Sequence, residues 1–129
     1  MKKILLLISF VAATTCMLQA QAYNAKMGTD TTLAVAGTKT YTATVTGGKS
    51  NLAFQMNITK NSGTVAGSIV LKGSIDGGTT YATLATHTLT DASAVWLDTY
   101  AYNPCQKYQV IVTTTGTSST TWQVWILYR

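Results

Sequence analysis

The stretch GSIVLKGSIDGGTTY, residues 67–81, decides the fold class of this chain. An apolar, β-branched run leads into an Asp-Gly-Gly turn and emerges at the aromatic Tyr81. Gly and Asp tolerate the positive φ angles that tight hairpin turns demand, and β-branched and aromatic residues suit a pleated, half-buried surface. The stretch therefore predicts a β-hairpin, and period two places these residues along one side of its first strand: Gly67, Ile69, Leu71, Gly73 and Ile75.

The turn of this hairpin carries a side-chain pattern of its own. Residues 74–81 fit the spacing S-x-D-x-G-x-T-aromatic and resemble the Asp-box hairpin of sialidase propeller blades. In such a turn the Asp and Ser side chains bond to nearby backbone N–H groups, and the aromatic ring packs over them. A propeller needs several repeated blades, and only one copy occurs here. The pattern predicts a structural, non-catalytic turn formed by Ser74, Asp76, Gly77, Gly78, Thr80 and Tyr81.

The first 22 residues are expected to be a signal peptide and not part of the fold. Lys2 and Lys3 form a basic segment, residues 4–13 an apolar one, and Ala20-Gln21-Ala22 a small-residue cleavage site. This is the order of a secretory leader. The apolar run of about ten residues is shorter than the roughly 20 that a membrane span needs, so no stable span is expected. The sequence thus predicts export to the periplasm, the extracellular space or a virion surface, with a retained N-terminal anchor as the alternative.

Residues 23–129 have the size of one small domain. Strand-like runs alternate with Gly, Asn, Ser and Asp at the regular short spacing of an all-β sandwich or barrel, and no helical period occurs. The clearest strand has apolar residues at period two, from Leu52 to Ile58. We expect a single antiparallel β-sandwich, immunoglobulin-like or jelly-roll-like, of about seven or eight strands over residues 23–129.

Charge and cysteine content narrow the classes of partner. Residues 23–129 carry seven basic and four acidic side chains, a net charge of +3, and the lysines are spread singly. Because Lys and Arg are not clustered, the sequence predicts no basic surface that could contact the phosphate backbone of a nucleic acid. Nucleic-acid binding is therefore not expected. Cys105 is the single cysteine of this range, which excludes an internal disulfide. It is interpreted either as a small buried thiol or as a bridge to another chain.

The acid–base groups are too few for a catalytic site, and we expect no enzyme and no catalytic residues. His87, the only histidine, lies in a strand-like run over residues 81–89, where a partly buried strand residue is favoured over a general base. Cys105, His87 and an Asp form a triad only formally, because no local signature accompanies them. One His, one Cys and four Asp lack close ligand spacing, so neither a metal nor a cofactor is expected.

Aromatic residues of the last third are the remaining candidates for a binding site. Trp122 and Trp125 cannot share a face of one strand, because their separation is odd. If Trp122 faces the core, Trp125 and Leu127 lie on the opposite face, near Arg129. An exposed Trp-Leu pair marks a stacking platform for a sugar or a surface buried against another subunit. Trp125, Leu127 and Arg129 are therefore the candidate interface, unless a second sheet or a loop covers Trp125 within the monomer.

A wider set of motifs resembles small β-sandwich proteins encoded by tailed bacteriophages. Over roughly residues 52–129 these are G-x-I-V-L-x-G-S-x-D-G-G-x-x-Y, W-x-x-x-Y-x-Y and K-Y-x-V-x-V-T-T-x-G-T-S. The SNDG turn of that family reads Ser74-Ile75-Asp76-Gly77 here, and Tyr81 stands in its tryptophan position. The resemblance implies a structural or surface-exposed role in a virion, where sandwiches pack against one another or against a capsid or tail surface.

Two classes of function follow. The first is a non-enzymatic structural or surface protein, a phage virion accessory such as a decoration or fibre-associated subunit, which self-associates or contacts other virion or surface proteins. The second is a secreted bacterial surface adhesin or carbohydrate-binding module with a glycan as partner, and the signal peptide argues for this class directly.

Overall fold

A computed structural model describes residues 23–45, 51–101 and 104–129, and the predicted signal peptide lies outside this part of the chain. Within these ranges the chain forms nine β-strands and no helix, and therefore contains no helix that could cross a membrane. Every strand pair is antiparallel. The strands are β1 (Tyr23–Lys26), β2 (Thr31–Ala34), β3 (Gly37–Thr44), β4 (Leu52–Ser62), β5 (Gly67–Ser74), β6 (Ala82–Thr88), β7 (Ala94–Tyr100), β8 (Lys107–Thr114) and β9 (Ser119–Tyr128).

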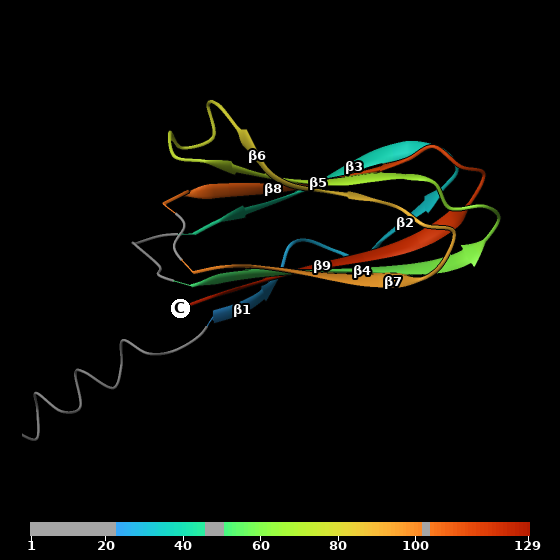
Figure 1. Ribbon diagram of the computed structural model, residues 1–129, viewed down its shortest axis with the longest axis horizontal. Helices are drawn as coiled ribbons and strands as arrows, with labels where there is room; N and C mark the ends of the chain where they lie inside the picture. Colours follow the sequence, from blue (N-terminus) through green and yellow to red (C-terminus); the bar gives the residue numbers. More distant parts are fainter. Residues whose placement is uncertain (1–22, 46–50, 102–103) are drawn as a thin grey trace, which may run out of the picture.

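The strands form two stacked sheets, which Figure 1 shows as a lower and an upper layer. The first, here called the β9 sheet, has the order β1-β9-β4-β7, and β2 pairs with the other half of β9. The second, the β8 sheet, has the order β3-β8-β5-β6. This architecture confirms the predicted antiparallel β-sandwich. The expected number of strands was too low because β1 and β2, of four residues each, are too short to show a recognisable alternation.

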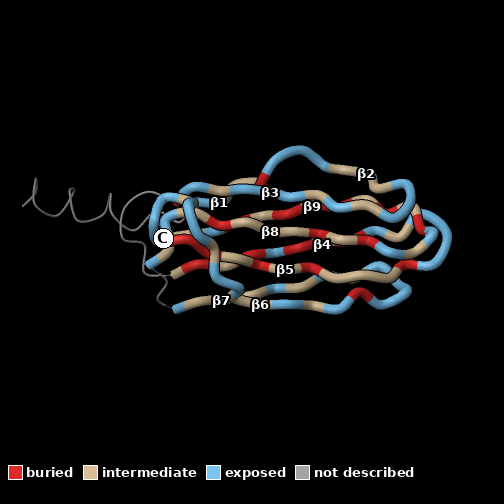
Figure 2. The backbone as a smooth tube through the Cα atoms, turned by 90° about the horizontal axis from the view of Figure 1, so that it is seen from above, coloured by how far each residue is buried: buried red, intermediate tan, exposed pale blue. Residues whose placement is uncertain are grey.

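The core fills the space between the two sheets. Alternate residues of the long central strands point inward and are buried, as the red segments along the tube show (Figure 2). Phe54 of β4 and Tyr108 of β8 meet across the sheets with ring centroids 5.2 Å apart. Burying each large apolar side chain contributes about 1.5–3 kcal/mol to the free energy of folding, so these rows hold the sheets together. The rows are Leu52, Phe54, Met56 and Ile58 in β4, Ile69 and Leu71 in β5, Tyr108, Val110 and Val112 in β8, and Trp122, Val124 and Ile126 in β9.

The hairpin turn between β5 and β6 is held by side chains. Asp76 accepts hydrogen bonds from the backbone N–H groups of Thr79 and Thr80, each at 3.0 Å, and from the Thr80 hydroxyl at 2.6 Å. The Ser74 hydroxyl donates to Asp76 at 2.6 Å and accepts from the Gly78 N–H at 2.8 Å. β5 ends at Ser74 for this reason, and the expectation that Ile75 shares one side of the strand with Ile69 and Leu71 was wrong, since those two are buried and Ile75 is 67% exposed.

Alternation also fails at one point in β6. The pairing with β5 shifts between Leu71 and Lys72, so that Leu84 is an extra residue in its strand. Leu84 and Ala85, although neighbours in sequence, therefore both pack against the core. A bulge of this kind also bends an edge strand away from its ladder.

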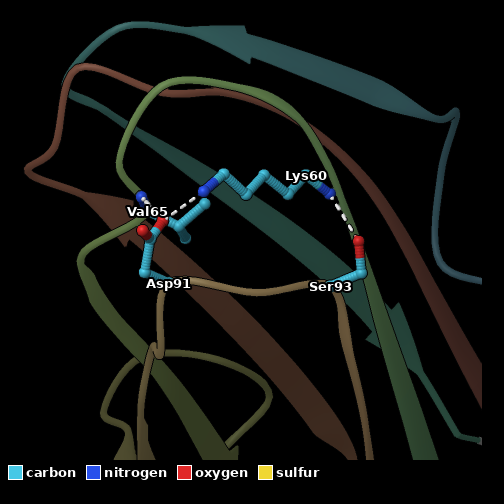
Figure 3. A network of polar contacts seen from close by, with 4 residues as sticks. All are labelled: Lys60, Val65, Asp91 and Ser93. Atoms are coloured by element: carbon cyan, nitrogen blue, oxygen red, sulfur yellow. Dashed lines mark hydrogen bonds and ion pairs between the residues drawn. The ribbon is translucent and has the colours of Figure 1, made fainter.

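Polar contacts connect the crossover between β6 and β7, residues 89–93, to the end of β4 and to the loop after it (Figure 3). Asp91 accepts hydrogen bonds from the Lys60 ammonium and from the Val65 backbone N–H, both at 2.7 Å. The Lys60 backbone N–H donates to the Ser93 hydroxyl at 2.9 Å. Lys60, and after it the Val65 N–H, lower the pKa of Asp91, so the carboxylate stays charged in this role. These contacts position β7 beside β4 in the β9 sheet.

Asp76→Asn is expected to lower the melting temperature most near neutral pH. The hydrogen bonds from Ser74 and then from Thr80 hold the pKa of Asp76 well below its ordinary value. Because the folded pKa is the lower one, the charged carboxylate stabilises the fold above its unfolded pKa of about 4, and this contribution is lost as pH falls toward the folded value. Thermal melts between about pH 7 and about pH 3 should therefore show the gap between parent and variant narrowing in acid. A gap that widens in acid contradicts this role.

Candidate functional site

The outer face of the β9 sheet carries the candidate site. Along β9, Trp122 points inward and is fully buried, whereas Trp125 is half-buried on the other side and Leu127 is 37% exposed. The register places Gln55 of β4 opposite Trp125, and Ala53 opposite Leu127. On the other side of β9, Lys26 of β1 is also opposite Trp125. Trp125 therefore stands in a row of outward side chains from three neighbouring strands.

A hollow of about 550 Å³ lies on this face. Ala53 has the smallest side chain of the lining, and longer side chains stand around it, which is why the surface is concave there. None of the eight lining residues carries a charge, and four of them are carboxamides. They are Asn24 of β1, Ala53, Gln55 and Asn57 of β4, Leu97 of β7, and Gln123, Trp125 and Leu127 of β9.

The hollow continues toward one end of the sheet. A second hollow of about 500 Å³ shares Ala53 and Leu127 with the first, so the two hollows adjoin at this β4–β9 pair, and together they are called the groove. The second part is lined by residues from the strand ends and the chain terminus: Asn51, Leu52, Ala53, Thr99, Tyr100, Ala101, Leu127 and Arg129.

The indole of Trp125 is held on one side by charged residues. The Lys26 ammonium lies 5.5 Å from the centroid of the ring. Lys26 forms an ion pair with Asp30, which also accepts a hydrogen bond from the Gln123 amide nitrogen at 3.1 Å. Lys26, and after it Gln123, lower the pKa of Asp30, so this pair stays charged. Lys26 is thus fixed between Asp30 and the indole on the β1 side of Trp125.

Two carboxamides on the β4 side are also oriented. The Gln55 amide nitrogen donates a hydrogen bond to the Asn57 amide oxygen at 3.0 Å. Each amide carries both a donor group and an acceptor, so the Gln55 oxygen and the Asn57 nitrogen retain hydrogen-bonding capacity. The groove therefore offers donors and acceptors next to the apolar surfaces of Trp125, Leu127 and Leu97.

The candidate residues taken from the sequence fall in two parts of this groove. Trp125 and Leu127 line the first hollow, and Arg129 lines the second. The turn residues around Asp76 belong to the β8 sheet and line neither hollow. Sequence reasoning missed the amide side chains and Leu97. Alternation in β4 places Gln55 and Asn57 outward, but nothing local indicates that β4 lies between β9 and β7.

The groups of the formal triad do not meet. His87 Nε2 lies 2.9 Å from an Asp98 carboxylate oxygen, and this pair links β6 to β7 across the open side of the sandwich. Cys105 is a half-buried thiol beside Gly73, at the opposite end of β5 from Ile69, the residue that pairs with His87. Burial raises the pKa of Cys105, which keeps it a thiol and a poor nucleophile. Within the described ranges no three His, Cys, Asp or Glu side chains gather as a metal site would need.

Comparison with models of known protein families and with curated protein sequences found no match. Among solved structures, the chain is similar to the PBSX exported protein XepA, with 11% identity, a TM-score of 0.59, and coverage of 82% of this chain and 36% of that one. It is also similar to infectious bursal disease virus, Gt strain, with 9% identity, a TM-score of 0.53, and coverage of 84% and 31%. A third similar structure is the enzymatically active domain of bacteriophage CBA120 tailspike protein 4, with 7% identity, a TM-score of 0.51, and coverage of 81% and 19%.

These similarities are of fold. The chain spans less than two thirds of the length of each of these proteins, at identities too low to carry an activity across. They agree with the β-sandwich.

Proposed function

We propose that the protein is a non-enzymatic attachment subunit, displayed on a virion or exported to a cell surface, that holds another macromolecule through the outer face of the β9 sheet. One observation carries the proposal: the groove around Trp125 combines a large half-buried aromatic ring with uncharged polar side chains. A concave surface with apolar walls and a few polar groups is a typical binding site. None of the eight residues lining the first hollow is a group that titrates near neutral pH, which suits binding and not acid–base chemistry.

The setting proposed first is a virion accessory, such as a decoration or fibre-associated subunit. The sequence motifs that resemble small tailed-phage sandwiches support it, as does the similarity of fold to XepA and to a phage tailspike domain. The signal peptide predicted for residues 1–22 supports export, and XepA is itself described as an exported protein. The second candidate is a secreted adhesin or carbohydrate-binding module, which the carboxamides beside Trp125 favour.

Fractionation of the native source tests the attachment. We expect the parent protein to sediment with phage particles or with the cell envelope, and Trp125→Ala to move into the soluble fraction because the groove loses its aromatic wall. Val95→Ala is the control, since Val95 is an exposed aliphatic residue of the same sheet, 65% exposed, that lines neither hollow. The proposal fails if the parent is recovered as a free soluble protein, or if Trp125→Ala stays attached as the parent does.

A further inference from the structure

We infer that the occupant of the groove is a neutral glycan chain, one sugar ring of which stacks on Trp125. This inference rests on the proposed function and names the partner of the same face. The first step is the charge of the first hollow, around Trp125, which distinguishes it from the second hollow, which Arg129 lines. None of the eight side chains that line the first hollow is charged, and Lys26 beside Trp125 is already paired with Asp30. An anionic ligand would meet no free counter-charge within this hollow, whereas a neutral one needs none.

The second step is the hydrogen-bonding character of the lining. Asn24, Gln55, Asn57 and Gln123 each carry a donor and an acceptor on one planar group. Sugar hydroxyl groups also donate and accept together, so they match carboxamides in either orientation. Gln55 and Asn57 bond to each other and Gln123 bonds to Asp30, but each amide keeps further donor or acceptor capacity. An apolar protein surface laid over the same face would bury these remaining donors and acceptors unpaired, which is costly.

The third step is the apolar surface offered by the groove. Trp125 stands between Lys26 on the β1 side and Gln55 on the β4 side, so its position is fixed before a ligand arrives. A sugar ring presents a flat face of C–H groups, which suits an indole, and a prearranged aromatic ring loses little conformational entropy on binding. Leu97 and Leu127 add apolar contact on either side of Ala53.

The fourth step is the shape of the site. The first hollow adjoins the second at Ala53 and Leu127, and their lining runs from Asn57 of β4 to Asn51, just before that strand. The six steps between these two residues span roughly 20 Å in extended chain. An open groove of this length accommodates several linked sugar units and not a single enclosed monosaccharide. The geometry thus points to a chain, lying across the outer face.

The experiment measures binding of neutral hexasaccharides to the full chain by calorimetry, with cellohexaose, maltohexaose and mannohexaose as probes and hexagalacturonate as the acidic control. We expect at least one neutral probe to bind. Trp125→Ala should weaken that binding about tenfold or more, because a central aromatic anchor is lost. Leu97→Ala should also weaken it, whereas Val95→Ala should remain within about twofold of the parent. These two residues form a matched pair on β7, being 64% and 65% exposed, and only Leu97 lines the groove.

Two further readouts separate the inference from simpler explanations. Ala53→Trp fills the floor of the groove from an outward position, so it should abolish binding while thermal melts show that the variant stays folded. Binding of the neutral probe should change little between about 0.05 and about 0.5 M salt, because no ion pair forms.

Each outcome supports or overturns the inference. It is overturned if no neutral probe binds, if only hexagalacturonate binds, or if Trp125→Ala binds as the parent does. If no neutral probe binds but surface attachment still depends on Trp125, the groove holds a protein and the proposed function stands. If a neutral probe binds at Trp125 while the protein is found unattached in its native source, the glycan site stands and the attachment role falls.

Discussion

Trp122→Ala is expected to lower the free energy of unfolding by about 3–5 kcal/mol, the range for removing a buried aromatic side chain. Trp122 is fully buried between the sheets. Its indole N–H donates a hydrogen bond of 2.9 Å to the Thr120 hydroxyl, which is also fully buried and would lose that partner. A domain of this size is stable by only about 5–15 kcal/mol, so the variant should be close to unfolding at ambient temperature. Guanidinium titration followed by tryptophan fluorescence measures the change.

Trp125→Ala is the matched control, because the same side chain is removed from the same strand three residues later. Trp125 lies on the outer face and is half-buried, so its loss should change the free energy of unfolding by within about 1 kcal/mol. If both variants lose stability equally, Trp125 is a core residue, and the outer face has no aromatic anchor for a ligand.

Gly67→Ala is expected to destabilise the fold by about 3 kcal/mol or more, through strain and a direct clash. Gly67 begins β5 with a φ angle of +130°, and a Cβ atom there would lie 1.9 Å from the Thr113 carbonyl oxygen. The backbone of β8 would have to move, and with it the ladder in which Gly67 pairs with Thr114. Thermal and chemical unfolding of the variant beside the parent measure the loss.

Gly77→Ala is the control that separates the cost of a positive φ angle from the cost of a steric clash. Gly77 lies in the hairpin turn with a φ angle of +72°, and nothing stands within 4 Å of the position a Cβ would take. Only the left-handed conformation is penalised there, so about 1–2 kcal/mol is expected. Equal melting temperatures for the two variants would show that the close approach of Gly67 to Thr113 does not exist in the folded protein.

The features of this structure that the sequence predicts are local ones, namely which face of a strand a side chain occupies and where a tight turn lies. Side chains alternate strictly along a strand, so Trp122 and Trp125 fall on opposite faces whatever the strand pairs with. The Asp-Gly-Gly turn requires positive φ angles that Gly77 and Gly78 supply, and it predicts the hairpin of β5 and β6 without knowledge of the rest. Alternation is misleading where a local contact overrides it, as at the bulge beside Leu84 and at Ile75.

The groove itself depends on pairing between distant segments, which periodicity does not report. Leu97 reaches it because β7 pairs with β4, and Asn24 because β1 pairs with β9 at the far end of the chain. The contact of His87 with Asp98 likewise depends on two edge strands in different sheets. Carboxamides on outward positions are common on sheet surfaces, so Gln55 and Gln123 become site candidates only once the strands are placed side by side.

Indole N–H signals in a nitrogen-15 NMR titration report whether the outer face of the β9 sheet binds a ligand at Trp125. Trp96, Trp122 and Trp125 each contribute one such signal, which single substitutions assign. On addition of a neutral hexasaccharide we expect the Trp125 signal to shift, while the signal of the buried Trp122, whose indole N–H is bonded to Thr120, stays in place. A titration in which the Trp125 signal does not move, or in which Trp122 responds instead, would contradict it.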